Sequence, residues 1–234
     1  MHCLICKQPF LEKISWQFVY ALTTPAMICE LCSEKLTEIQ GEICRKCGRP
    51  FAHLDPQFRS GDRCADCIRW QSDALEKNRS LYVYNDFLQE VIATWKYRGD
   101  AELVKLFWQP LQKAAKQFPV DVAVPIPLDE TRLYERSFNQ AKLLAEGLPF
   151  EVVEVLQRPQ ESRKQSKKTR KERLQEEDKE EKFQIVPALL HTIQDKKVLL
   201  VDDIYTTGAT LYEAAAVLKA NQAAHVYALT VARG

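Results

Sequence analysis

Two kinds of apolar run fill the last two thirds of the chain. Short, almost wholly apolar runs are typical of buried strands, and they occur at residues 80–84, 121–127, 152–156, 197–204 and 225–232. Longer runs place their apolar residues at helical spacing, and they occur at residues 86–97, 101–117, 137–146 and 209–220. Pro110 lies inside the second of these helices, where we expect a kink or a break.

Strands and helices alternate in this region. Such alternation is typical of an α/β domain with a largely parallel sheet flanked by helices. We therefore expect this domain to span residues 80–234, after a connector that begins at residue 71. Residues 158–182 interrupt the pattern because they are almost wholly polar, first basic and then acidic. A solvated loop or helix face is the simplest interpretation of that segment.

The first part of the chain is marked by cysteines instead. All eight cysteines fall there, in four C-x-x-C pairs: Cys3, Cys6, Cys29, Cys32, Cys44, Cys47, Cys64 and Cys67. Two residues between thiolates allow a tight turn to aim both sulfurs at one tetrahedral zinc ion. Four such pairs are a strong zinc signal, so we expect residues 1–70 to be a zinc-binding module. A single retained site and redox use of the cysteines are the alternatives.

The pairing of these cysteines has two solutions. Sequential pairing places the first four in one site and the last four in another, which makes a double zinc ribbon. A crossed arrangement would use alternate pairs. We expect sequential pairing because each loop can close locally. Four thiolates fill the tetrahedron and leave no position for water, so the zinc is expected to be structural.

The segment 198–210 carries the candidate chemistry. An apolar strand ends in two carboxylates, and a loop of hydroxyl residues and one glycine leads into a helix. The residues are Asp202, Asp203, Thr206, Thr207, Gly208, Ala209 and Thr210. Ligands of open α/β sheets bind at the carboxyl ends of strands, and a helix N-terminus offers N–H groups to a phosphate. The carboxylates could accept hydrogen bonds from sugar hydroxyls or meet Mg²⁺. This order predicts a site for ribose 5-phosphate.

This segment resembles the 5-phosphoribosyl-1-pyrophosphate (PRPP) signature of type I phosphoribosyltransferases. Over nearly the full length, the chain resembles the competence ComF/ComFC proteins, which join a cysteine-rich module to such a domain. Other segments similar to this family's motifs are 96–100, 124–128, Arg132, Arg136 and 138–140. Arg158, Gln165 and Arg173 are similar to anchors of a mobile hood loop, which would make 158–176 a lid. Ser137 stands where the family often has glycine, and Glu176 stands near a usual asparagine.

The resemblance implies a type I phosphoribosyltransferase fold and a Mg²⁺-dependent reaction in which PRPP loses pyrophosphate. Negative charge then grows on the leaving group, and fixed cations should stabilise it. The loop after the strand at 124–127 is the expected pyrophosphate loop. Arg132 is its first candidate cation and Arg136 its second, although both could be surface charges. The catalytic candidates are therefore Asp202, Asp203 and Arg132, and no residue stands out as the general base.

Composition narrows the function classes. Lys and Arg total 33 and Asp and Glu total 32, which excludes a strongly basic coat for nucleic acid but not a local basic patch. No run of about 18 apolar residues occurs. The N-terminus lacks the basic and apolar regions of a secretory signal. We therefore expect a cytoplasmic protein without a membrane span.

Three functions stay open at this point. The first is a Mg²⁺-dependent phosphoribosyltransferase with an unknown acceptor. The second is a non-catalytic adaptor that binds PRPP, and the third binds single-stranded DNA directly through the basic run at 163–173. Aromatic residues such as Trp16, Phe51, Trp70 and Trp95 could stack on bases. Such residues more often belong to the core. The resemblance implies a role in natural transformation, with the helicase-like ATPase ComFA as partner in the uptake of single-stranded DNA.

Overall fold

The computed structural model describes residues 1–11, 26–52, 54–70, 72–97, 100–159 and 182–234. A five-stranded sheet lies at its centre, in the order β3-β9-β8-β4-β5, and every neighbouring pair of strands is parallel. The strands are β3 (Asn78–Val83), β4 (Val122–Pro125), β5 (Glu151–Val152), β8 (Lys197–Tyr205) and β9 (His225–Arg233). Because the strands are parallel, their carboxyl ends share one edge of the sheet.

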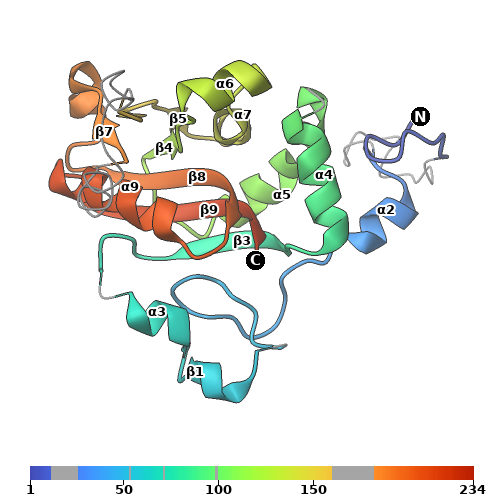
Figure 1. The fold of residues 1–234 in the computed structure, drawn as a ribbon, viewed down its shortest axis with the longest axis horizontal. Coiled ribbons are helices and arrows are strands. Elements are labelled where there is room, and N and C mark those ends of the chain that lie inside the picture. The colour runs from blue at the N-terminus through green and yellow to red at the C-terminus, as the bar shows by residue number, and fades with distance from the viewer. Residues whose placement is uncertain (12–25, 53, 71, 98–99, 160–181) are drawn as a thin grey trace, which may run out of the picture.

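Helices cover both faces of this sheet (Figure 1). Those on one face are α4 (Asp86–Tyr97), α5 (Lys105–Ala115) and α7 (Gln140–Glu146), and the other face carries α9 (Ala209–Ala220). Strand β8 explains how both faces are filled, because successive side chains of a strand point to opposite sides. Leu199 and Val201 join the core with α4, whereas Val198 and Leu200 join the core with α9.

The two halves of the cysteine-rich region lie at different places on this sheet domain (Figure 1). The first half contains α2 (Glu30–Lys35) and lies beside α4, where Lys7 Nζ is 2.6 Å from Asp100 Oδ2. The second half contributes its four cysteines and Phe51 to the core on the α9 side. Its elements are a 3-10 helix (Pro56–Phe58), β1 (Arg59–Ser60), β2 (Arg63–Cys64) and α3 (Ala65–Arg69).

Several predicted elements are confirmed. The helices expected at 86–97 and 209–220 are α4 and α9, with the same bounds. The strands expected at 80–84, 121–127, 197–204 and 225–232 are β3, β4, β8 and β9, with ends that differ by at most two residues. These elements carry the densest apolar patterns, so local sequence was sufficient to find them.

The region after β4 differs from the prediction. We expected a loop there, followed by a helix over 137–146, but the chain forms α6 (Glu130–Arg136) and then α7. Asp129 begins α6 by accepting a hydrogen bond from the Arg132 N–H at 2.8 Å. Ser137 ends it with a φ of 64°. That left-handed conformation favours glycine, which fits the expectation that the family often has glycine at this position.

Two other predictions need correction. The helix expected over 101–117 is a 3-10 helix (Ala101–Val104) followed by α5, and Pro110 lies inside α5 without breaking it. The strand expected at 152–156 is two short strands in different sheets. The first is β5, at the edge of the main sheet, and the second is β6 (Leu156–Gln157), which pairs antiparallel with β7 (Gln184–Ile185).

Candidate functional site

The loop between β8 and α9 has the backbone geometry of an anion site. Gly208 precedes α9 with a φ of 89° and offers no side chain to cap the helix. A Cβ at this position would lie 2.2 Å from Tyr205 Oη, so only glycine fits. Thr206 and Thr207 are exposed, and Ala209 and Thr210 are half-buried in the first turn. The N–H groups of this turn and the helix dipole therefore favour an anion at the loop.

Two carboxylates lie at the carboxyl end of β8, just before this loop. Asp202 and Asp203 are half-buried, and the Asp203 N–H donates to Asp202 Oδ1 at 2.9 Å. Asp203 forms an ion pair with Lys96 of α4, and these two side chains are 13% and 16% exposed. Lys96 thus holds one of the two carboxylates in place.

The electrostatic state of Asp202 follows from this crowding. Burial and the neighbouring charge of Asp203 raise the pKa of Asp202 to about 8, whereas the charges of Lys96 and Arg158 act in the opposite direction. A cation bound beside this carboxyl group would favour its ionised form and displace its proton. Carboxylate oxygens are ligands that Mg²⁺ accepts, so this pair fits the ion that the family implies.

Both arginine candidates for the pyrophosphate lie in α6, the helix that follows β4. Arg132 is in α6 rather than in a loop, its side chain is 59% exposed, and its Nε is 3.4 Å from Asp129 Oδ2. Arg136, at the end of α6, donates to Gln140 Oε1 at 3.0 Å and lies over the Tyr97 ring. Within the described residues, the polar contacts of both guanidinium groups go to these partners and not to the carboxylates.

Parts of the expected lid fall outside the described residues, among them Gln165, Arg173, Glu176 and the basic run at 163–173. Arg158 is described, and its Nε donates to the Pro127 carbonyl at 3.1 Å. Its guanidinium also lies 4.7 Å from the centre of the Phe183 ring. Arg158 therefore joins the end of β6 to the segment after β4, near the edge of the sheet that carries the loop.

The aromatic residues considered for base stacking do not form one exposed surface. Trp95 and Phe51 are buried in the core, with 0% and 8% exposure. Trp70 stacks on Tyr212 with ring centres 4.5 Å apart. Trp16 lies outside the described residues. The three described rings therefore serve packing within the fold.

The cysteines gather into two groups of four, in the sequential pairing (Cys3, Cys6, Cys29, Cys32; Cys44, Cys47, Cys64, Cys67). Within each group all sulfurs lie within 4.8 Å of one another. Cys6 Sγ is 3.8 Å from Cys29 Sγ, and Cys47 Sγ is 3.6 Å from Cys64 Sγ. A tetrahedron with Zn–S bonds of about 2.3 Å has sulfurs about 3.8 Å apart. Both groups therefore fit a structural zinc ion, and all eight cysteines are free of disulfide bonds.

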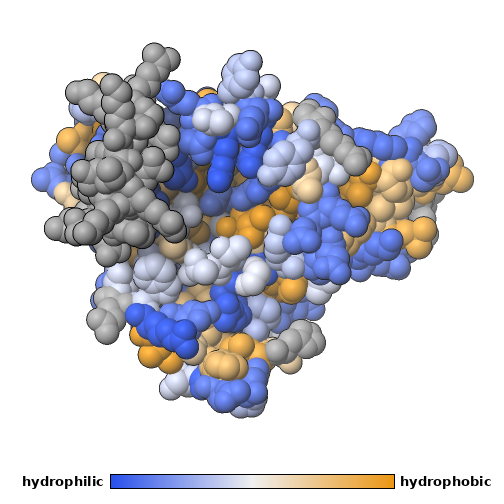
Figure 2. Space-filling view, in the orientation of Figure 1, coloured by the Kyte–Doolittle hydropathy of each residue, from blue (hydrophilic) through white to orange (hydrophobic). Residues whose placement is uncertain are grey.

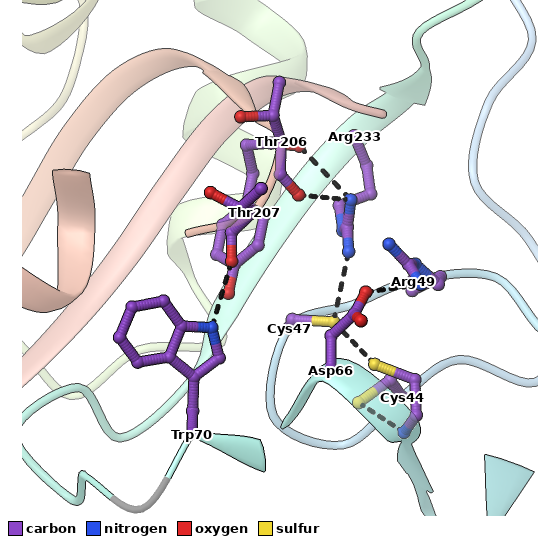
Figure 3. A network of polar contacts seen from close by, with 10 residues as sticks. Cys44, Cys47, Arg49, Asp66, Trp70, Thr206, Thr207 and Arg233 are labelled. Carbon is purple, nitrogen blue, oxygen red and sulfur yellow. Dashed lines mark hydrogen bonds and ion pairs between the residues drawn. The ribbon is translucent and has the colours of Figure 1, made fainter. Parts of the chain in front are cut away.

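Arg233 and Trp70 connect the second cysteine group to the loop between β8 and α9, as Figure 3 shows. Arg233 of β9 donates from Nη1 to the Thr206 carbonyl at 2.9 Å and from Nη2 to Cys47 Sγ at 3.6 Å. Trp70 Nε1 donates to the Thr207 carbonyl at 3.2 Å. The face that carries this region is hollowed between the α6 side and the second cysteine group (Figure 2).

Comparison with known proteins agrees with this geometry. Residues 137–234 match the family described as "Phosphoribosyl transferase domain". The competence protein ComFC of Bacillus subtilis (strain 168) is 37% identical over 244 residues, an alignment that covers 99% of this chain and 94% of that protein. The chain belongs to the ComFC family. The ComFC competence protein of Streptococcus pneumoniae (strain ATCC BAA-255 / R6) is 30% identical over 215 residues and covers 90% of either chain.

Two solved structures match parts of this chain weakly. An allosteric regulatory enzyme of purine biosynthesis is 18% identical, with a TM-score of 0.37 over 55% of this chain and 26% of that chain. A purine phosphoribosyltransferase from Pyrococcus horikoshii is 16% identical, with a TM-score of 0.31 over 56% of this chain and 82% of that chain. Scores this low add nothing to the assignment.

Three of the predictions stand confirmed for this ComFC-family chain. It has a phosphoribosyltransferase-fold α/β domain with a mostly parallel sheet, and it carries a cysteine-rich module before that domain. Its relatives support a role in competence. Among the described residues, no helix has both the length and the apolar character needed to cross a membrane.

Sequence reasoning missed three residues that the structure places around the loop. Lys96 was noted only as part of a family-like segment, and its pairing with Asp203 depends on a contact between distant parts of the chain. Trp70 was considered only for base stacking or the core. Sequence reasoning also missed Arg233, which is 3% exposed in the structure. Its signal in the sequence was an arginine at the end of a strand that is expected to be buried.

Proposed function

We propose that this protein binds PRPP, or its ribose 5-phosphate part, at the loop 206–210 and acts through this site in competence. The observation that carries the proposal is the order of groups along one edge of the sheet. Two carboxylates end β8, and the glycine-containing loop and the start of α9 follow directly. The match to a phosphoribosyl transferase domain covers this segment.

Each part of the site has a task that its chemistry supports. The first turn of α9 and the hydroxyls of Thr206 and Thr207 would bind the 5-phosphate. Asp202 and Asp203 would accept hydrogen bonds from the ribose hydroxyls or hold Mg²⁺. Mg²⁺, when it accompanies PRPP, neutralises charge on the pyrophosphate. Lys96 would keep Asp203 oriented while the ligand enters.

We also propose roles for other residues, metal ions and partners of this protein. Arg132 and Arg136 are proposed to reach the pyrophosphate, and both structural zinc ions are proposed to occupy the cysteine groups. Transfer of the phosphoribosyl group to an unknown acceptor, the helicase-like ATPase ComFA as partner, single-stranded DNA as a second ligand and a cytoplasmic location rest on the family resemblance. We also propose 1–70 and 80–234 as the domain boundaries.

Calorimetric titration of PRPP, with and without Mg²⁺, tests the binding proposal. The wild-type protein should show saturable, Mg²⁺-sensitive binding. Because binding favours ionised Asp202, it should release protons, and the heat should change with the ionisation enthalpy of the buffer. The combined Asp202→Asn/Asp203→Asn variant should bind at least about tenfold more weakly, since hydrogen bonds to charged groups are lost.

Asp121→Asn is the matched control for this titration. Asp121 lies at the opposite end of the sheet, where its Oδ2 accepts from the Lys197 N–H at 2.8 Å. This variant should bind PRPP as the wild type does. An absence of binding at millimolar PRPP would refute the proposed function.

A further inference from the structure

The two cysteine groups have different relations to the loop. The second group lies next to the loop. Arg233 and Trp70 connect the two by donating to the carbonyls of consecutive loop residues, Thr206 and Thr207 (Figure 3). The first group lies beside α4 instead, and its neighbouring ion pair joins Lys7 to Asp100. This difference makes the first group an internal control for any role of the second.

Arg233 is the first connection between the second group and the loop. Its Nη1 donates to the Thr206 carbonyl at 2.9 Å and to the Tyr205 carbonyl at 3.3 Å, while its Nη2 faces Cys47 Sγ at 3.6 Å. The guanidinium also lies 4.7 Å from the centre of the Tyr205 ring. One buried side chain therefore touches a proposed metal ligand and the backbone that leads into the loop.

The charge of the second cysteine group determines how it acts on Arg233. A buried cation is costly unless an opposite charge lies next to it. A zinc ion and four thiolates together carry a net negative charge, which suits the buried guanidinium of Arg233. The zinc-loaded group therefore favours the position of Arg233 from which it holds the Thr206 carbonyl.

Trp70 is the second connection, and it is independent of the first. It follows α3, which contains Cys67, and its backbone N–H donates to the Asp66 carbonyl at 3.1 Å. Its indole Nε1 donates to the Thr207 carbonyl at 3.2 Å, and its ring stacks on Tyr212 of α9 with an interplanar angle of 8°. Trp70 thus fixes the second loop carbonyl and the first turns of α9 relative to the cysteine group.

We propose that Arg233 and Trp70 are positioning residues through which the zinc-loaded Cys44/Cys47/Cys64/Cys67 group holds the loop ready for a sugar phosphate. The inference rests on the proposed function, because it concerns the same loop. Contacts with Arg233 and Trp70 fix the Thr206 and Thr207 carbonyls. The Ala209 N–H, which contacts Thr207 Oγ1 at 3.4 Å, would then turn to the phosphate. Linkage then requires a reciprocal effect: ribose 5-phosphate must strengthen zinc retention at this group and not at the first.

The test combines ribose 5-phosphate affinity with zinc release in the full chain. Zinc loss to a coloured chelator is followed with and without ribose 5-phosphate. The two groups are expected to release zinc in two phases. A Cys6→Ser protein, which lacks one ligand of the first group, shows which phase belongs to the second group. We expect ribose 5-phosphate to slow release from the second group alone. Trp70→Phe keeps the stacked ring but removes the N–H donor. It should weaken affinity about three- to tenfold and reduce the effect on zinc release.

Three further variants separate positioning from general stability. Trp108→Phe is the matched control, because it also removes an indole donor to a backbone carbonyl, that of Leu143 at 2.9 Å, away from the loop. It should leave affinity and zinc release unchanged. Arg233→Gln should weaken affinity and zinc retention together, and Arg233→Lys should restore part of both.

The outcomes distinguish this inference from the function on which it rests. If the wild-type protein does not bind ribose 5-phosphate, the proposed function itself is wrong. If it binds, but Trp70→Phe behaves as Trp108→Phe does, the positioning role is overturned. Equal slowing of zinc release from both groups would also overturn it, because that pattern reflects stabilisation of the whole fold.

Discussion

Replacement of Cys47 by serine should lower the melting temperature of the whole chain by about 10 °C or more. Loss of a ligand from a structural metal site belongs to the most damaging class of substitution, at about 4 kcal/mol. For a chain of this size, each kcal/mol corresponds to about 2–4 °C. Cys47 is 1% exposed and belongs to the same apolar core as α9 and the sheet.

The damage should spread because the second cysteine group is joined to the sheet itself. Asn78, the first residue of β3, donates from Nδ2 to the Cys47 carbonyl at 3.1 Å and from its N–H to the Lys46 carbonyl at 2.7 Å. Asn78 is fully buried. Loss of this anchor would therefore loosen an edge strand of the main sheet.

Cys6→Ser is the control for the Cys47 prediction. Cys6 is exposed and belongs to the first group, beside α4. Melting followed by circular dichroism, with zinc quantified in each protein, should show a clearly smaller loss for Cys6→Ser. A Cys47→Ser protein that loses zinc yet melts as the wild type does would contradict the structural role of the second group.

Gly208→Ala should reduce the affinity for ribose 5-phosphate about a hundredfold, which corresponds to the loss of two hydrogen bonds to a charged group. The new Cβ would lie 2.2 Å from Tyr205 Oη and 2.5 Å from Tyr205 Cζ. Tyr205 is 2% exposed and packs against Arg233, so it has little room to move. The loop backbone would have to shift, and the N–H groups of the first turn of α9 would shift with it.

Gly41→Ala separates this clash from the cost of the backbone conformation. Gly41 has a φ of 76°, close to the 89° of Gly208, but a Cβ there would meet no atom within 4 Å. Its replacement should cost only about 1 kcal/mol of stability and leave affinity unchanged. Calorimetric titration of both variants measures the difference. Equal affinity in the Gly208→Ala protein and the wild type would show that the loop does not bind the phosphate.

The sequence alone was sufficient for the parts of the fold in which local pattern dominates. Strand β8 and helix α9 carry dense apolar runs. The carboxylates, hydroxyls and glycine between them follow one another in an order that is typical of a sugar-phosphate site. The sequential pairing of the cysteines also follows from local loop closure. These features place the loop 206–210 and both cysteine groups without any knowledge of tertiary contacts.

Other features depend on tertiary contacts or on weaker signals. Helix α6 has a polar sequence with little apolar periodicity. Its sequence signal is Asp129, a residue type that often caps the start of a helix. The left-handed Ser137 that ends it is visible only in the structure. The pairing of Lys96 with Asp203 joins residues that are far apart in the chain. The same holds for Trp70 and Thr207, and for Arg233 and Cys47. No periodicity or spacing predicts such pairs.

A crystal structure with ribose 5-phosphate and Mg²⁺ bound tests the central claim most directly. Our account predicts the phosphate within hydrogen-bonding distance of backbone N–H groups in residues 206–210, with the ribose hydroxyls facing Asp202 and Asp203. It also predicts that the Thr206 and Thr207 carbonyls keep their contacts with Arg233 and Trp70. A phosphate bound elsewhere, such as in the cavity of about 450 Å³ that Arg45, Lys46 and Lys77 help to line, with the loop free of ligand, would contradict the account.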